Sequence, residues 1–187
     1  MQIKNSLSGG YYMLNKIFVL LSLIFTVGII FGSTEYVYSS EDFQAALNNK
    51  DVTKIVIRSD LTGNFVCKRG NLEIVGNGKT LKPEKKEDKI LFFNGPVYNR
   101  HENLKIKDLR FEGAEAEALY LENYNGIELK ELEFYDNEIA LTIDGCFNTE
   151  IHSSRFESCT FSIYLTNGFS HMGGYLLLED NSSCASK

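Results

Sequence analysis

A repeat of 22 to 23 residues constrains the fold of this chain more than any other feature of its sequence. The pattern Leu-x-Ile-x-x-Leu-x-Phe at residues 104–111 returns as Ile-x-Leu-x-x-Leu-x-Phe at 127–134 and as Thr-x-Ile-x-x-Ser-x-Phe at 149–156. A second apolar pair follows each copy, at positions 119 and 121, 141 and 143, and 163 and 165. Such a repeat indicates an array of similar units that stack on one another.

Within each unit the apolar residues alternate with polar ones, which is typical of a β-strand with one buried face. Asn, Asp and Gly separate two strands per unit, and this leaves no room for a helix of ordinary length. One unit buries its apolar face only against the next, with equivalent side chains about 4.8 Å apart. The sequence therefore predicts an interior ladder of Phe111, Phe134 and Phe156, an aliphatic ladder of Leu119, Leu141 and Ile163, and an outer row of Arg110, Glu133 and Arg155.

The repeat is expected to continue at both ends. Leu-Glu-Asp-Asn at 178–181 follows Phe-Tyr-Asp-Asn at 134–137 by 44 residues, which predicts a further, degraded unit in the same register. Upstream, residues 41–47 have helical spacing with Ser39 or Ser40 as N-cap, and strand-like segments follow at 54–57, 64–66 and 72–75. A helix there would cover the open edge of the first coil. The charged run at 82–89 is predicted to be a protruding loop.

This pattern resembles the right-handed parallel β-helix proteins of the pectate-lyase-like superfamily over about residues 40–181. The features that carry the resemblance are the helical cap, Ile-Val-Ile at 55–57, the segment Leu-Glu-Ile-Val-Gly-Asn-Gly-Lys-Thr-Leu at 72–81, and the regular coils. The resemblance implies an all-β fold: a right-handed parallel β-helix of about five coils with a short N-terminal capping helix. A leucine-rich repeat is the rival interpretation, since residues 129–139 fit its consensus, but the second half of each unit has strand spacing.

The N-terminus carries an export signal. Residues 17–31 form an apolar run without charge, preceded by Lys16, and this length suits a signal peptide better than a spanning helix. We expect a signal peptide at 1–39 with cleavage after Ser39, or at Gly32 or Ser33 instead. Uncleaved, the segment would anchor the chain in a membrane, and translation could begin at Met1 or Met13. The β-helix domain is then expected at 40–187, and the chain could be incomplete at its C-terminus.

Four cysteines, Cys67, Cys146, Cys159 and Cys184, occur in this exported chain. They permit two disulfides in three possible pairings, or they could be isolated thiols buried in the core. No Cys-x-x-Cys is present, so the sequence gives no support for a zinc site or a thioredoxin-like redox motif.

The charge and the repeat together indicate an interaction module. A formal charge of −6 and a pI near 5.2 argue against nucleic acid as a partner, because phosphate binding needs a clustered positive excess. We expect a secreted or cell-surface, adhesin-like protein whose partners are glycans or surface proteins, without a cofactor. Tyrosines such as Tyr120, Tyr135 and Tyr164 on flat stacked faces could bind sugars by stacking.

The alternative is a polysaccharide lyase or glycoside hydrolase that acts on acidic polysaccharide. The resemblance implies that such enzymes use carboxylates, sometimes with calcium, and a basic residue that moves a proton. Two stacked pairs are the candidates: Asp108 with Glu131, and Glu122 with Asp144. The sequence places no dedicated Arg or Lys beside either pair, and no residue matches a catalytic motif of the family.

Overall fold

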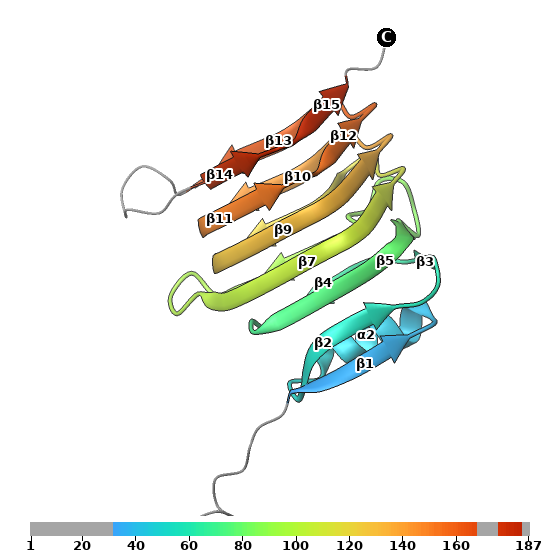
Figure 1. The fold of residues 1–187 in the computed structure, drawn as a ribbon, viewed down its shortest axis with the longest axis vertical. Helices are drawn as coiled ribbons and strands as arrows, with labels where there is room; N and C mark the ends of the chain where they lie inside the picture. The colour runs from blue at the N-terminus through green and yellow to red at the C-terminus, as the bar shows by residue number, and fades with distance from the viewer. Residues whose placement is uncertain (1–31, 168–175, 185–187) are drawn as a thin grey trace, which may run out of the picture. The chain divides into compact units, whose positions relative to one another are not determined.

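The chain winds as a right-handed parallel β-solenoid of about six turns, the handedness that parallel strand crossovers favour. We describe residues 32–167 and 176–184 of a computed structural model (Figure 1). The fold class predicted from the repeat is confirmed. The leucine-rich repeat interpretation is wrong, because strands and not helices form the second half of each unit.

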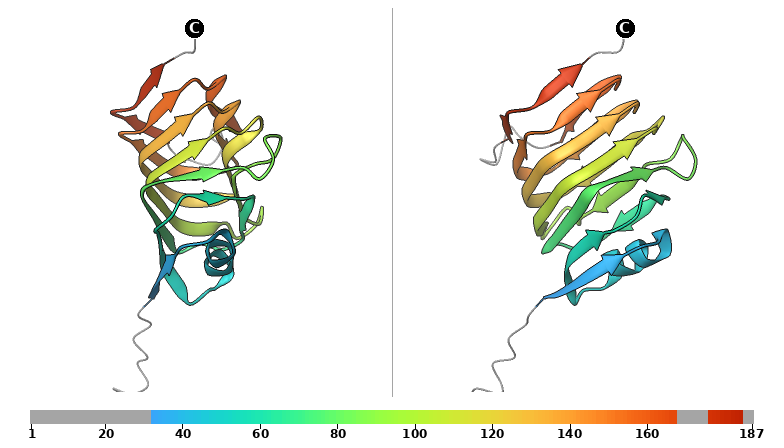
Figure 2. Two further views of the ribbon diagram at one scale, coloured as in Figure 1. Left: turned by 90° about the vertical axis from the view of Figure 1, so that its right-hand side faces the viewer. Right: turned by 45° about the vertical axis from the view of Figure 1, so that its right-hand side comes forward.

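Two parallel sheets make up the solenoid. The first runs in the order β1 (Ser33–Val37), β2 (Val52–Ile57), β5 (Leu72–Lys82), β7 (His101–Glu112), β9 (Tyr124–Tyr135), β11 (Phe147–His152) and β14 (Leu176–Glu179), with β3 (Leu61–Thr62), β12 (Arg155–Glu157) and β15 (Ser182–Cys184) beside it. The second contains β4 (Phe65–Cys67), β6 (Leu91–Asn94), β8 (Glu117–Glu122), β10 (Ile139–Asp144) and β13 (Phe161–Thr166). Figure 2 shows these strands stacked coil upon coil.

Left-handed backbone at the same place in successive coils turns the chain from one face to the next. In these residues φ lies between 47° and 86°, a region that Asn, Asp and Gly tolerate best. The long strands β5, β7 and β9 bend at one such corner, which divides the first sheet into face 1, before the bend, and face 2, after it; the second sheet is face 3. The corner residues form four columns: Asn71, Asn103, Gly126, Asn148; Asn77, Asp108, Glu131, Ser153, Asp180; Gly113, Asp136, Ser158; and Asn123, Gly145, Asn167.

Both interior ladders are present as the repeat predicted. The rings of Phe111, Phe134 and Phe156 are stacked, with centroids 5.1 and 5.0 Å apart and planes within 10°. Leu119, Leu141 and Ile163 are register partners on face 3. The outer row also has the predicted register, although Arg110 contacts Glu133 at 3.7 Å while Arg155 pairs with Glu157.

The predicted register of the last unit is wrong. Leu178 pairs with Ile151 on face 1 and does not continue the phenylalanine ladder. These partners are 27 residues apart, five more than one regular coil, so the insertion displaces the last unit. A further unit does begin there, as expected, with β14.

The helix α2 (Ser40–Asn48) covers the first coil, with Ser39 as its N-cap. The side-chain amide of Gln44 donates to the carbonyl of Val66 (2.8 Å) and accepts from its N–H (2.9 Å), which closes the free edge of β4. The buried guanidinium of Arg69 donates to the last carbonyls of the helix, those of Leu47 at 2.8 Å and Ala46 at 3.1 Å. The capping helix predicted from residues 41–47 is therefore present.

The first strand, β1, lies ahead of the domain boundary that we expected between residues 39 and 40. It pairs with β2 along its whole length, and Val37 is fully buried. The apolar run 17–31 lies outside the described residues, so cleavage after Ser39 stays a prediction, and it would remove this strand. No helix in the described part of the chain is long and apolar enough to cross a membrane.

Candidate functional site

The structure brings Asp108 and Glu131 together as equivalent corner residues of adjacent coils. Their neighbours Lys107 and Lys130 are register partners, as are Leu109 and Leu132. Both residues have left-handed backbone, with φ of 53° and 54°, at the bend between face 1 and face 2. Their position is therefore explained by the turn, whatever further role their carboxylates have.

Lysines lie next to this corner, contrary to the expectation that no cation accompanies the pair. Lys130 contacts the carboxylate of Glu131 at 3.3 Å, and Lys107 contacts that of Glu73 at 2.8 Å. The hydrogen bond to Glu73 raises the pKa of Lys107, which keeps this ammonium protonated. A lyase base must be neutral when it removes a proton, so Lys107 is unsuited to that role.

The second pair, Glu122 and Asp144, lies at the end of face 3. These residues are register partners in β8 and β10, and Asp144 accepts a hydrogen bond of 2.8 Å from the hydroxyl of Tyr120. The pKa of Tyr120 is raised well above its ordinary value, mainly by burial and to a smaller extent by this hydrogen bond. The phenol therefore remains protonated and acts as a donor. The two candidate pairs occupy different corners of the solenoid and do not form one site.

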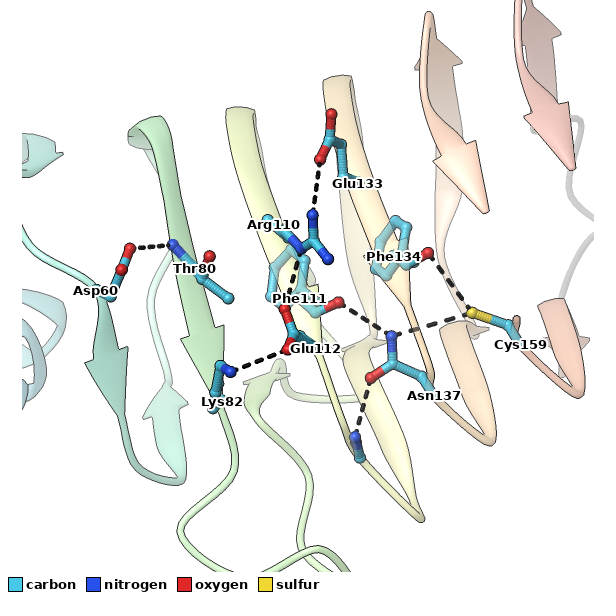
Figure 3. A network of polar contacts seen from close by, with 11 residues as sticks. Asp60, Thr80, Lys82, Arg110, Phe111, Glu112, Glu133, Phe134, Asn137 and Cys159 are labelled. Carbon is cyan, nitrogen blue, oxygen red and sulfur yellow. Dashed lines mark hydrogen bonds and ion pairs between the residues drawn. The ribbon is translucent and has the colours of Figure 1, made fainter. Parts of the chain in front are cut away.

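A polar cavity of about 270 Å³ lies at the corner between face 2 and face 3, and it contains none of the four candidate carboxylates. It is lined by Lys86, Gly113, Ala114, Glu115, Asp136, Asn137, Glu138, Ser158 and Thr160. Asn137 is buried at this corner, where it accepts from the N–H of Ala114 (3.0 Å) and donates to the carbonyl of Phe111 (3.1 Å) (Figure 3). The sequence showed Asp136 and Asn137 as part of the segment Phe-Tyr-Asp-Asn at 134–137, and it gave no sign of a cavity.

The outer surface of face 3 carries a column of three aromatic residues and one threonine. Phe92, Tyr120, Thr142 and Tyr164 are register partners in successive coils. Sequence reasoning named Tyr120 and Tyr164 and missed the other two, although both lie between the two apolar positions of a unit, where the alternation places an outward side chain. Tyr135, the third tyrosine named, lies on face 2, where the guanidinium of Arg110 sits 4.9 Å from its ring centre.

The interpretation of the cysteines as isolated thiols is confirmed for Cys67, Cys146 and Cys159, which are free. Burial raises the pKa of Cys67 and raises that of Cys146 to about 12. Cys159 is partly buried, and the side chain of Cys184 lies outside the described residues. The thiolate is the reactive form, so the two buried thiols are expected to be inert.

Thiol labelling checks this expectation. In a Cys184→Ser variant, the native protein should react with a small disulfide reagent at Cys159 alone, and three thiols should react after unfolding without reductant. Rapid labelling of Cys67 or Cys146 in the native state would contradict their burial. Fewer than three thiols in the unfolded, unreduced protein would reveal a disulfide.

Among residues 32–167 and 176–184, no group of three or more His, Cys, Asp or Glu side chains is placed to hold a metal ion. His152 lies between Glu150 at 3.3 Å and Glu179 at 3.0 Å on face 1.

The fold and these surfaces define a class: a parallel β-solenoid with regular, exposed faces and a capped first coil. Residues 34–139, more than half of the chain, match the family model of the pectate lyase-like adhesive domain. The chain belongs to this family. The match runs from β1 into the first residue of β10 and includes the capping helix. No curated protein and no solved structure matches the chain.

Proposed function

We propose that this chain is an exported adhesive module, secreted or held at the cell surface, that binds a glycan or a surface protein without altering it. The observation that carries the proposal is the match of residues 34–139 to an adhesive domain family. The placement of the candidate carboxylates supports it, because the pairs lie at separate corners and outside the polar cavity.

An adherence assay tests the proposal. Beads coated with the full chain are added to surfaces that carry mannan, cellulose, polygalacturonate, hyaluronan, collagen or fibronectin. We expect adherence to at least one surface, above that of beads coated with the heat-unfolded chain, and no release of unsaturated or reducing ends. If the beads adhere to none of these surfaces, the proposal is overturned.

The lyase alternative has one observation in its favour: Asp108 and Glu131 share a corner with Lys130, which contacts the carboxylate of Glu131 at 3.3 Å. If the chain were such an enzyme, polygalacturonate with added calcium would yield unsaturated ends. Asp108→Asn and Glu131→Gln would then abolish that release. Release from the wild-type chain that both variants eliminate would replace the adhesive proposal with the enzymatic one.

Export is proposed on the apolar run at 17–31. Cleavage after Ser39 would remove β1, which pairs with β2, whereas cleavage at Gly32, a small residue directly before the strand, would keep it. The pairing therefore favours cleavage at Gly32. N-terminal sequencing of the exported chain distinguishes these sites. A mature chain that begins at Ser40 would mean that β1 is dispensable for the fold, and a chain that begins at Met1 or Met13 would indicate an uncleaved anchor.

A further inference from the structure

The outer surface of face 3 carries a group of aromatic rings where face 1 carries ion pairs. Phe92 packs edge-on against Tyr120, with ring centroids 5.0 Å apart, and Tyr164 is 51% exposed. On face 1, by contrast, the ammonium groups of Lys54 and Lys107 both contact Glu73. Part of the aromatic surface of face 3 is therefore exposed and not covered by charged side chains.

A polar column runs beside the rings at the same coil spacing. Asn94, Glu122, Asp144 and Thr166 are register partners in β6, β8, β10 and β13. Asp144 already accepts from the hydroxyl of Tyr120, and Glu122, its register partner, places a second carboxylate in this column. A sugar presents C–H groups on the faces of its ring and hydroxyls at its edge. Rings with acceptors about 4.8 Å apart along a solenoid suit both parts of such a ligand.

Thr142 is an independent sign of a ligand at this surface. The strand alternation points it outward between its register partners Tyr120 and Tyr164, yet it is only 2% exposed. Its hydroxyl has no hydrogen-bond partner, and an unpaired buried hydroxyl destabilises a fold. Tyr164, its register partner in the next coil, has a half-exposed ring, and side-chain rotations at such positions are common on binding.

The charge of the surface selects among glycans. Glu122 and Asp144 lie along the column. Of the cations beside it, Lys89 is held by Glu117 at 2.7 Å and lies 4.9 Å from the centre of the Tyr120 ring, and Arg100 donates to the carbonyl of Gly145. Carboxylates accept hydrogen bonds from hydroxyls and repel uronate groups. An acidic polysaccharide would therefore meet like charge here.

We infer that the outer surface of face 3, centred on Tyr120, Thr142 and Tyr164, is the glycan-binding site of this module and takes an uncharged glycan. This inference rests on the proposed adhesive function and specifies its ligand class. The sugar rings pack on Tyr164 and Phe92, and one sugar hydroxyl pairs with the hydroxyl of Thr142.

The test measures binding of the full chain to immobilised mannan and cellulose, with polygalacturonate as the acidic comparison. We expect binding to at least one of the two neutral polysaccharides and not to polygalacturonate. Tyr164→Ala and Thr142→Val should each weaken that binding about tenfold. Two matched controls should leave it unchanged: Tyr135→Ala removes an exposed tyrosine of face 2, and Thr149→Val removes a second unpartnered buried hydroxyl of the described residues, which lies in the core.

Both threonine variants should raise the thermal unfolding midpoint, because each removes an unpaired buried hydroxyl, so a loss of binding in Thr142→Val alone cannot come from unfolding. Binding of polygalacturonate only, or equal losses in Tyr135→Ala and Tyr164→Ala, would overturn the inference. Adherence to collagen or fibronectin with no glycan bound would also overturn it, and would leave the adhesive function standing.

Discussion

Replacing Phe134 with alanine is expected to lower the free energy of unfolding by about 3–5 kcal/mol, the usual cost of emptying a core aromatic site. Phe134 is 1% exposed and lies between the rings of Phe111 and Phe156, so its removal breaks two stacked contacts at once. Because each coil of a solenoid is stabilised by its neighbours, a cavity in the middle coil weakens both interfaces. Urea unfolding followed by circular dichroism measures the loss.

The neighbouring residue in the same strand provides the control. Tyr135 points outward and is 37% exposed, so Tyr135→Ala should cost less than about 1 kcal/mol, mainly through the lost contact with Arg110. Phe134→Leu, which refills most of the volume, keeps the comparison possible if the alanine variant does not fold. Equal losses for Phe134→Ala and Tyr135→Ala would contradict an interior phenylalanine ladder.

The phenylalanine ladder could be predicted because two periods act together. The strand period of two residues sets which side chains point inward, and the coil period of 22 to 23 residues sets which of them meet. Neither period requires knowledge of the turns. The same reasoning gave the outer row of Arg110, Glu133 and Arg155, whose register is also confirmed.

The last unit shows where this reasoning fails. Asp180 and Asn181 resemble Asp136 and Asn137, and the likeness suggested one register for both. In the structure Asp136 belongs to the corner after face 2, whereas Asp180 belongs to the corner between face 1 and face 2. All corners require left-handed backbone, so the same residue types recur at each of them, and turn residues alone do not identify a corner.

Two other features could not be predicted from the repeat. The strand β1 has one buried residue, Val37, and so lacks an alternating pattern. Phe92 belongs to a coil with extra residues on both sides of β6, at 83–90 and 95–100, which hides its place in the face 3 column. The candidate surface was therefore visible in the sequence only through Tyr120 and Tyr164, and the unpartnered hydroxyl of Thr142 needed coordinates.

Replacing Gly76 with alanine is expected to cost about 3 kcal/mol or more, because the added methyl group has no space. A Cβ there would lie 2.2 Å from the carbonyl oxygen of Asp108 and 2.7 Å from the Cα of Leu109, both backbone atoms of the next coil. Relief requires β5 and β7 to separate, and these strands form the centre of the first sheet. The measurement is again urea unfolding, with soluble yield as a second readout.

Gly78, in the same corner, serves as a control that distinguishes a steric clash between coils from the cost of a left-handed backbone. It has a φ of 66°, and the nearest atom to its Cβ would be the carboxylate of Asp108 at 3.9 Å, so Gly78→Ala should cost only the left-handed strain of about 1–2 kcal/mol. Equal destabilisation of the two variants would mean that the turn conformation governs this corner. A near-neutral Gly76→Ala would mean that adjacent coils are farther apart at Asp108 than the structure places them, and the stacked ladders would then lack their spacing.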